Sequence, residues 1–166
     1  DSAFEDCLSL TSIEIPSSVT SIGRWAFSKC CFTLVAIPES VTSIEGYIFN
    51  ECSNLTSITI PNSVTSIKEY AFNSCTSLTS VTIPSSVTSA GHSSFGNCPN
   101  LKTAGPIGGG YNIEFGWTTS IIASAFDGCS SLTSIEIPSS VTSIESYAFY
   151  GCSSLATIII PSSVTS

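Results

Sequence analysis

The chain repeats one pattern of apolar and polar positions along its whole length. In each copy, a segment such as residues 10–16 (Leu-Thr-Ser-Ile-Glu-Ile-Pro) alternates apolar and polar residues. A period of two is typical of a β-strand that buries one face and exposes the other. The closing proline has no N–H to donate to a neighbouring strand, so we expect the strand to end there.

Recurring residues show that the pattern is an internal repeat. The step between copies is 22 or 23 residues, with a single step of 31 residues. Such a period predicts a solenoid in which neighbouring copies cover one another's apolar side. We expect one strand per copy, paired in parallel with the next, and a further apolar ladder from the V-T-S-I segment. The A-F-x-x-C segment is expected to form one helical turn on the opposite wall, with phenylalanine and cysteine on the same side. These two residues recur as Phe4, Phe27, Phe49, Phe72, Phe95, Phe126 and Phe149, and as Cys7, Cys30, Cys52, Cys75, Cys98, Cys129 and Cys152.

The three segments L-x-x-I-x-I-P, V-T-S-I and A-F-x-x-C together resemble the BspA-like leucine-rich repeats. The resemblance covers nearly all of the chain. It implies an α/β leucine-rich-repeat solenoid, a β-rich right-handed coil. One parallel sheet of about seven strands would line the concave side, with short helical turns and loops on the convex side. We expect residues 1–166 to form a single domain, and because they begin and stop within a repeat, to be a fragment of a longer protein.

The same resemblance implies a function. Such proteins are extracellular or attached to the cell surface, and they serve adhesion and protein binding without catalysis. The expected partner is therefore a protein, such as a host extracellular matrix or surface protein. Neither end of the chain looks like a polar solenoid cap, so end-to-end self-association is also expected. An inert structural spacer within a larger surface protein is the alternative.

Charge narrows the range of partners further. The chain has 4 Lys and Arg against 12 Asp and Glu, which gives a net charge of −8. Nucleic acids and anionic membrane surfaces both attract basic patches, so neither is an expected partner. No apolar run approaches the roughly 20 residues that a membrane-spanning helix needs, so membrane insertion is not expected.

The fifth repeat is extended around residues 105–120, and it carries the first candidate binding residues. Insertions in a solenoid emerge as loops on one face, which is often a binding face. Within 108–117, three aromatic residues and one carboxylate would grip a peptide or a carbohydrate. Alternatively, the aromatic rings fold back and cover a gap beside small core residues. The candidate residues are Tyr111, Glu114, Phe115 and Trp117.

Two further rows supply candidate protein-binding residues. Glu14 and Glu136 share an outward strand position among Ser and Thr columns, which either bind a partner or only keep the sheet soluble. An aromatic residue precedes the Ala-Phe pair in several repeats. These rings either shield the phenylalanine file from water or form a ridge that contacts protein. The members of this aromatic row are Trp25, Tyr47, Tyr70 and Tyr147.

No catalytic, metal or cofactor site is expected. Seven cysteines hold the same repeat position, which favours a reduced file inside the coil over disulfides. The single histidine, His92, stands without a C-x-x-C motif or a nucleophile motif, and we interpret it as a solvated substitution. We therefore predict a non-enzyme. Asn54-Leu55-Thr56 matches a glycosylation sequon, whose use depends on a eukaryotic secretory source.

Overall fold

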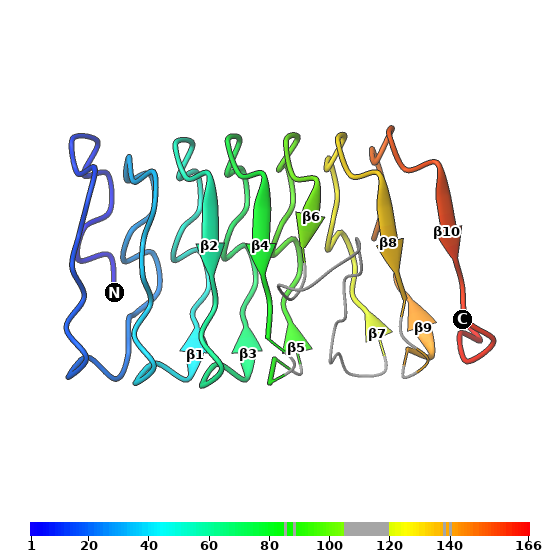
Figure 1. Cartoon of the computed structure of the whole chain (residues 1–166), viewed down its shortest axis with the longest axis horizontal. Helices are drawn as coiled ribbons and strands as arrows, with labels where there is room; N and C mark the ends of the chain where they lie inside the picture. Colours follow the sequence, from blue (N-terminus) through cyan, green and yellow to red (C-terminus); the bar gives the residue numbers. More distant parts are fainter. Residues whose placement is uncertain (85, 88, 105–119, 138, 140) are drawn as a thin grey trace.

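The computed structural model describes residues 1–84, 86–87, 89–104, 120–137, 139 and 141–166. The chain winds into successive coils that lie side by side along the long axis of the molecule, with the two termini at opposite ends (Figure 1). Strands form at two places in the coil, one before and one after the proline turn, and a wall of turns follows the second; the first copy, residues 10–22, contains no strand. One repeat of the sequence therefore corresponds to one coil, as the period predicts.

The strands form two rows, each paired in parallel from coil to coil. In the first row, called the long-strand row, Ser57 lies opposite Ser80 and Ser80 lies opposite Thr103. In the second, the short-strand row, Ser43 lies opposite Ser66. The long-strand row consists of β2 (Ser57–Thr59), β4 (Ser80–Thr82), β6 (Thr103–Ala104), β8 (Ser134–Glu136) and β10 (Thr157–Ile159). The short-strand row consists of β1 (Ser43–Ile44), β3 (Ser66–Ile67), β5 (Ser89–Ala90), β7 (Ser120–Ile121) and β9 (Ser143–Ile144).

Two rows replace the single seven-stranded sheet that the sequence predicts. The V-T-S-I segment is responsible, because it also runs extended after the proline turn closed by the Val41 N–H to Pro38 carbonyl bond. Its backbone polar groups need partners, and β1, β3 and β5 provide them to one another. In the described residues neither row is continuous: β1–β3–β5 and β7–β9 are separate sheets, as are β2–β4–β6 and β8–β10.

The prediction of helical turns in the A-F-x-x-C segment is not confirmed, since the described residues contain no helix. Instead, every second backbone N–H of the segment donates to a carbonyl of the neighbouring coil. Phe27 donates to the Ile48 carbonyl at 3.0 Å, whereas Cys30 donates within its own coil to the Phe27 carbonyl at 3.1 Å. A helix would keep every bond within the segment. The wall is therefore a ladder of turns joined to its neighbours much as strands are.

The wall uses left-handed backbone at two positions in each coil, four residues apart. In the second coil, Trp25 has φ 61° and Lys29 has φ 60°. L-residues adopt this conformation at a cost of about 1–2 kcal/mol each. Glycine takes the second position in the last two coils, as Gly128 and Gly151. The other non-glycine members are Ser2, Asp6, Tyr47, Glu51, Tyr70, Ser74, Ser93, Asn97, Ser124 and Tyr147.

The core consists of files of identical residues, as predicted. Phe49 and Phe72 are fully buried and stack with ring centroids 5.5 Å apart at 12°. Stacked pairs of this kind continue from Phe4 to Phe149. Each buried phenylalanine contributes on the order of 2–3 kcal/mol through removal of its surface from water. A single coil lacks the neighbours that provide this cover, so stability comes from stacking.

The cysteine file does more than fill space. All eight cysteines are free, and six thiols donate to the phenylalanine carbonyl of the preceding coil at 3.1–3.3 Å. Burial raises the pKa of the Cys52 and Cys98 thiols to about 12. These thiols therefore stay protonated in the folded chain and are poor nucleophiles.

Among the described residues, strand pairing stops on either side of the extended repeat, whereas the wall continues across it. Among the described strands, β6 does not pair with β8 and β5 does not pair with β7. Across the same junction the wall continues, because Phe95 stacks on Phe126 at 6.1 Å and the Cys129 thiol donates to the Phe95 carbonyl at 3.2 Å. The wall therefore joins the two parts of the solenoid.

Candidate interaction surfaces

Three of the four residues in the predicted aromatic row form one continuous stack on the wall. The rings of Trp25 and Tyr47 lie 3.8 Å apart at 10°, and those of Tyr47 and Tyr70 lie 4.8 Å apart at 14°. All three share a left-handed backbone at the same place in consecutive coils, so the side chains leave the wall in the same direction. All three are partly exposed. We call Trp25, Tyr47 and Tyr70 the aromatic ridge.

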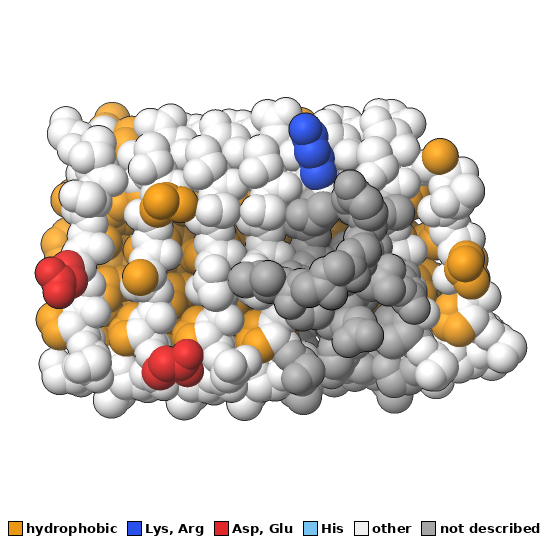
Figure 2. All heavy atoms as spheres, viewed as in Figure 1, with side chains coloured by type: hydrophobic (Ala, Val, Ile, Leu, Met, Phe, Trp, Pro, Cys, Tyr) orange, Lys and Arg blue, Asp and Glu red, His pale blue; other side chains and the backbone are white. Residues whose placement is uncertain are grey.

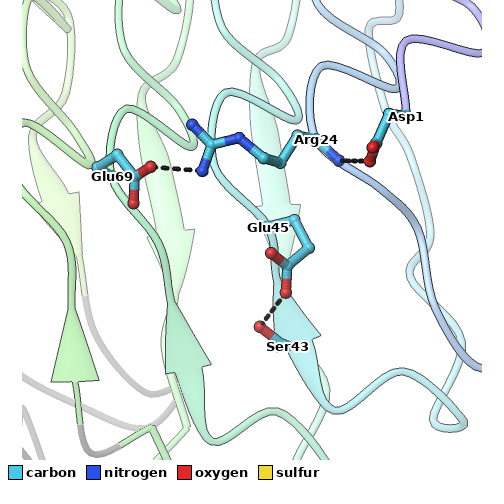
Figure 3. Close-up of polar contacts among 5 residues, drawn as sticks. All are labelled: Asp1, Arg24, Ser43, Glu45 and Glu69. Atoms are coloured by element: carbon cyan, nitrogen blue, oxygen red, sulfur yellow. Dashed lines mark hydrogen bonds and ion pairs between the residues drawn. The ribbon is translucent and has the colours of Figure 1, made fainter.

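An ion pair runs alongside the ridge. Arg24 reaches across the intervening coil to Glu69, with Nη1 and Oε1 2.6 Å apart (Figure 3). The guanidinium carbon also lies 5.4 Å from the centre of the Tyr47 ring, within reach of a cation–π contact. Hydrogen bonding to Arg24 holds the pKa of the Glu69 carboxyl below its usual value. The pair keeps a cation and an anion fixed beside the rings.

Gly46 makes room for this ion pair. It occupies the coil that Arg24 crosses, and a Cβ there would lie 3.0 Å from both Arg24 Nη1 and Glu69 Oε1. The neighbouring Glu45 does not join the pair, and its carboxylate instead accepts a hydrogen bond from the Ser43 hydroxyl at 2.8 Å (Figure 3). The ridge and its ion pair therefore depend on a small residue between them.

The ridge ends at His92, and Tyr147 lies apart from it. The His92 ring meets Tyr70 edge-on, with centroids 5.2 Å apart at 72°. His92 is exposed, as a solvated residue is expected to be, but its contact with Tyr70 was not predicted. Tyr147 pairs with Tyr150 instead, with centroids 5.7 Å apart, and both are about two-thirds exposed. Tyr150 was missed, although it is the one aromatic residue that directly follows the repeat phenylalanine.

The strand faces offer a different surface. Figure 2 shows that charged side chains are few there and that uncharged polar groups and backbone dominate. Neighbouring Ser43 and Ser66 hydroxyls lie 3.2 Å apart, so coil-to-coil hydrogen bonds occupy part of this hydroxyl array. The two predicted glutamates belong to different parts of the solenoid. Glu14 is exposed in the first coil, whereas Glu136 belongs to β8 in a separate sheet, opposite Ile159.

The remaining predicted residues lie outside the described part of the chain. They are Tyr111, Glu114, Phe115 and Trp117. Within the described ranges, no group of three or more His, Cys, Asp and Glu side chains is placed to hold a metal ion. The structure has no helix, among the residues it describes, of the length and apolarity required to cross a membrane.

Comparison with known proteins supports the repeat assignment. A family model described as a BspA type leucine rich repeat region matches residues 1–106 and 112–166, in six copies. None of the curated proteins matches the chain.

Solved structures show the same fold. A leucine-rich repeat protein from Bacteroides ovatus is 32% identical with a TM-score of 0.86, over 98% of this chain. A leucine rich cell surface protein from Faecalibacterium prausnitzii is 32% identical with a TM-score of 0.51, over 92%. The T. pallidum leucine rich repeat protein is 23% identical with a TM-score of 0.69, over 87%, which bears on the fold alone. The chain spans 40%, 54% and 66% of these proteins, respectively.

Proposed function

The chain belongs to the BspA-type leucine-rich repeat family, and we propose that it is a non-catalytic protein-interaction module of a cell-surface or secreted protein. Leucine-rich repeats generally serve as interaction or structural modules and not as enzymes. The likeness to a Faecalibacterium prausnitzii protein described as a cell surface protein supports the proposed location. A rigid stack of coils presents an extended surface at little entropic cost on binding.

The aromatic ridge is the observation that carries this proposal. Tyrosine, tryptophan and arginine dominate the energetics of protein interfaces, and Trp25, Tyr47, Tyr70 and Arg24 stand together on the wall. Stacking fixes the rings before binding, so little side-chain entropy remains to be lost. Among the residues that the structure describes, the strands carry no Trp, Tyr or Arg. We therefore assign partner binding to the ridge, in an adhesion or recognition role toward an extracellular matrix or surface protein.

A capture experiment tests this assignment. Immobilised wild-type chain and a Trp25→Ala, Tyr47→Ala, Tyr70→Ala variant are incubated with host extracellular material, and retained proteins are quantified by mass spectrometry. We expect a protein that the wild type retains and the triple variant loses. The matched control is Tyr147→Ala with Tyr150→Ala, which removes aromatic rings from the same wall outside the ridge. Equal retention by wild type and triple variant would refute the role of the ridge.

A structural spacer is the second candidate function. The observation that favours it is the strand face, where charged side chains are few (Figure 2) and the Ser43 and Ser66 hydroxyls already lie within hydrogen-bond distance of each other. In the same experiment, a spacer retains no protein in either form. Carbohydrate binding through residues 108–117 also stays a prediction. It is tested on a glycan array with Tyr111→Ala, Phe115→Ala and Trp117→Ala.

End-to-end self-association is a separate proposal. Ile158, Ile159 and Ile160 of the last coil are 36%, 79% and 55% exposed, and the outer edge of β10 has no partner among the described strands. Exposed apolar edge strands pair readily with other chains. We expect the mass of the isolated chain, measured by sedimentation, to rise with concentration. Replacing Ile159 by Lys should reduce that rise, since edge charges oppose pairing.

A further inference from the structure

We propose that Asn54 is an acceptor for an N-linked oligosaccharide when the chain passes through a secretory pathway that contains an oligosaccharyltransferase. Asn54, Leu55 and Thr56 satisfy the N-x-S/T requirement. No other asparagine of the sequence does so. Asn54 lies in the turn that leads from the wall to β2.

The local geometry suits a bulky glycan. Leu55 is fully buried in the core, and the two residues that flank it, Asn54 and Thr56, are both exposed. Among the residues that the structure describes, none hydrogen-bonds the Asn54 side chain. A glycan on this amide therefore extends into solvent and displaces no core residue and no hydrogen bond. The Thr56 hydroxyl, by contrast, donates to the Thr33 carbonyl at 3.1 Å and orders the turn.

Two other asparagines differ from Asn54 in the hydrogen bonding of their side-chain amides. Asn50 and Asn73 each lie two residues before a fully buried cysteine. Their amides are already used, Asn50 donating to Glu51 Oε1 at 3.1 Å and Asn73 to the Gly96 carbonyl at 3.2 Å. These two positions are therefore poor acceptors.

Asn100 is the closest internal comparison. It occupies the same place in its coil as Asn54, two residues after the repeat cysteine, and it is likewise exposed. The residue two positions after Asn100 is Lys102, whereas Thr56 follows Asn54 at that distance, so the sequon is missing at Asn100. The Asn100 amide also donates to the Thr76 carbonyl at 2.7 Å. The chain thus offers the same turn with and without the acceptor motif.

The transfer uses a lipid-linked oligosaccharide diphosphate as donor. The Asn54 Nδ2 atom forms a bond to the anomeric carbon of the first sugar, and the bond from that carbon to the diphosphate oxygen breaks. The lipid diphosphate leaves with the electron pair, and the amide gives up one proton. Nothing is oxidised or reduced. The inference rests on the secretion that the proposed function includes, and it does not depend on binding of a partner.

Secretion from cultured animal cells tests the proposal. The chain is expressed behind a cleavable signal peptide, and the secreted protein is deglycosylated enzymatically in ¹⁸O-labelled water and analysed by peptide mass spectrometry. We expect ¹⁸O-labelled aspartate at position 54. Asn54→Gln and Thr56→Ala should abolish the label, and the conservative Thr56→Ser should keep it. Lys102→Thr supplies the missing sequon at Asn100. We expect lower occupancy there than at Asn54, because the Asn100 amide donates to the Thr76 carbonyl.

Two results would overturn the proposal: secreted, folded wild type with an unmodified Asn54, or a glycan on Asn50 or Asn73 with none on Asn54. Misfolding is excluded by comparing thermal unfolding of wild type and Asn54→Gln made in bacteria, for which we expect equal midpoints. Partner binding is not read in this experiment, so its failure leaves the proposed interaction module standing.

Discussion

At the scale of single residues, the buried thiols set how the chain responds to alkaline conditions. Burial raises the pKa of Cys52 and Cys98 to about 12, whereas a thiol in an unfolded chain titrates near 8.5. Because the folded pKa is the higher one, the contribution of each thiol is complete below about pH 8.5 and is lost as the pH rises toward 12. Within that window, each thiol lowers the free energy of unfolding by about 1.4 kcal/mol per pH unit.

Urea unfolding at pH 7.5 and pH 9.5, under reducing conditions, measures this loss. We expect the wild type to lose more stability across this interval than a Cys52→Ala, Cys98→Ala variant. At pH 7.5 the variant has a lower free energy of unfolding than the wild type, because it lacks two buried sulfur atoms and their hydrogen bonds to the Phe27 and Phe72 carbonyls. Equal losses in the two proteins would contradict the assignment, since all other titrating groups are shared.

A second residue-scale prediction concerns the left-handed backbone. Glu51 has φ 58° and is exposed. Glycine there avoids a conformational cost of about 1–2 kcal/mol but adds about 0.5–1 kcal/mol of unfolded-state entropy. The variant also loses the hydrogen bond that Asn50 donates to Glu51 Oε1, which contributes about 0.5 kcal/mol or more. Net of these three effects, we expect Glu51→Gly to raise the free energy of unfolding by up to about 1 kcal/mol.

Ser53→Gly is the control for this substitution. It lies two residues away in the same turn, is also exposed and has no positive φ. Only the entropic cost applies, so its stability should fall by about 0.5–1 kcal/mol. Chemical denaturation of the two variants beside wild type distinguishes them, and a loss of stability in both would contradict the account.

Residue burial was predictable from sequence and backbone conformation was not. Phe49, Phe72 and Cys75 are fully buried as their register implies, because a repeated apolar position can only stack on its copies. Most left-handed positions carry residues such as Trp, Lys and Glu, which give no signal of positive φ. The sequence hints were the pair of glycines in the last two coils, with Asp6 and Asn97 at the equivalent position of other coils, since Asp and Asn adopt positive φ more readily than other L-residues. The thiol-to-carbonyl bonds had no signal, since a buried cysteine fits its position equally well as an apolar residue.

At the scale of elements, the dependence of the Arg24–Glu69 ion pair on the small residue Gly46 can be tested. An added Cβ would lie 3.0 Å from Arg24 Nη1 and from Glu69 Oε1, so Gly46→Ala should displace the two flexible ends. The pKa of Glu69 should then rise toward its usual value, because the Arg24 hydrogen bond that lowers it is weakened. Both side chains are exposed, so the free energy of unfolding should change by less than about 1 kcal/mol.

Titration of the Glu69 carboxyl by NMR checks this expectation. Arg24→Gln serves as the reference, because it removes the cation and leaves Gly46 in place. Both variants should raise the pKa of Glu69. An unchanged value in Gly46→Ala would mean that the ion pair tolerates a methyl group beneath it.

The strands of the long-strand row were predictable from the sequence, but the conformation of the A-F-x-x-C segment was not. The alternation around Ile58 and Val81 predicts a strand, and β2 and β4 form there. The short A-F-x-x-C segment fits a helical turn equally well on spacing alone. The decision depends on where the N–H of Phe27 finds its acceptor, and that acceptor, the Ile48 carbonyl, lies in another coil. A pattern within one repeat contains no information on such a bond.

At the scale of the whole molecule, the extended repeat divides the strands and leaves the wall intact. The sequence predicted where the chain departs from its period, and it located a candidate binding segment at 108–117. It did not predict that described strands on both sides of the insertion would end their ladders there while Phe95 still stacks on Phe126. Strand pairing needs matched register on every coil, whereas ring stacking tolerates the wider 6.1 Å spacing.

This division predicts where the solenoid opens first. In repeat proteins, stability is the sum of each coil's own stability and its contacts with adjacent coils. Phe126→Ala removes a fully buried ring at the junction where no described strand pairs with the next coil, whereas Phe72→Ala removes one where both strand rows are continuous. Each substitution should lower the free energy of unfolding by about 3–5 kcal/mol.

Hydrogen exchange distinguishes the two variants. In Phe126→Ala, exchange should accelerate after the junction, from β7 to β10, and stay slow in β1 to β4. In Phe72→Ala it should accelerate on both sides of the mutated coil, because the paired strands transmit the loss. Uniform acceleration across all strands in Phe126→Ala would show that the wall alone couples the two parts as strongly as the sheets do.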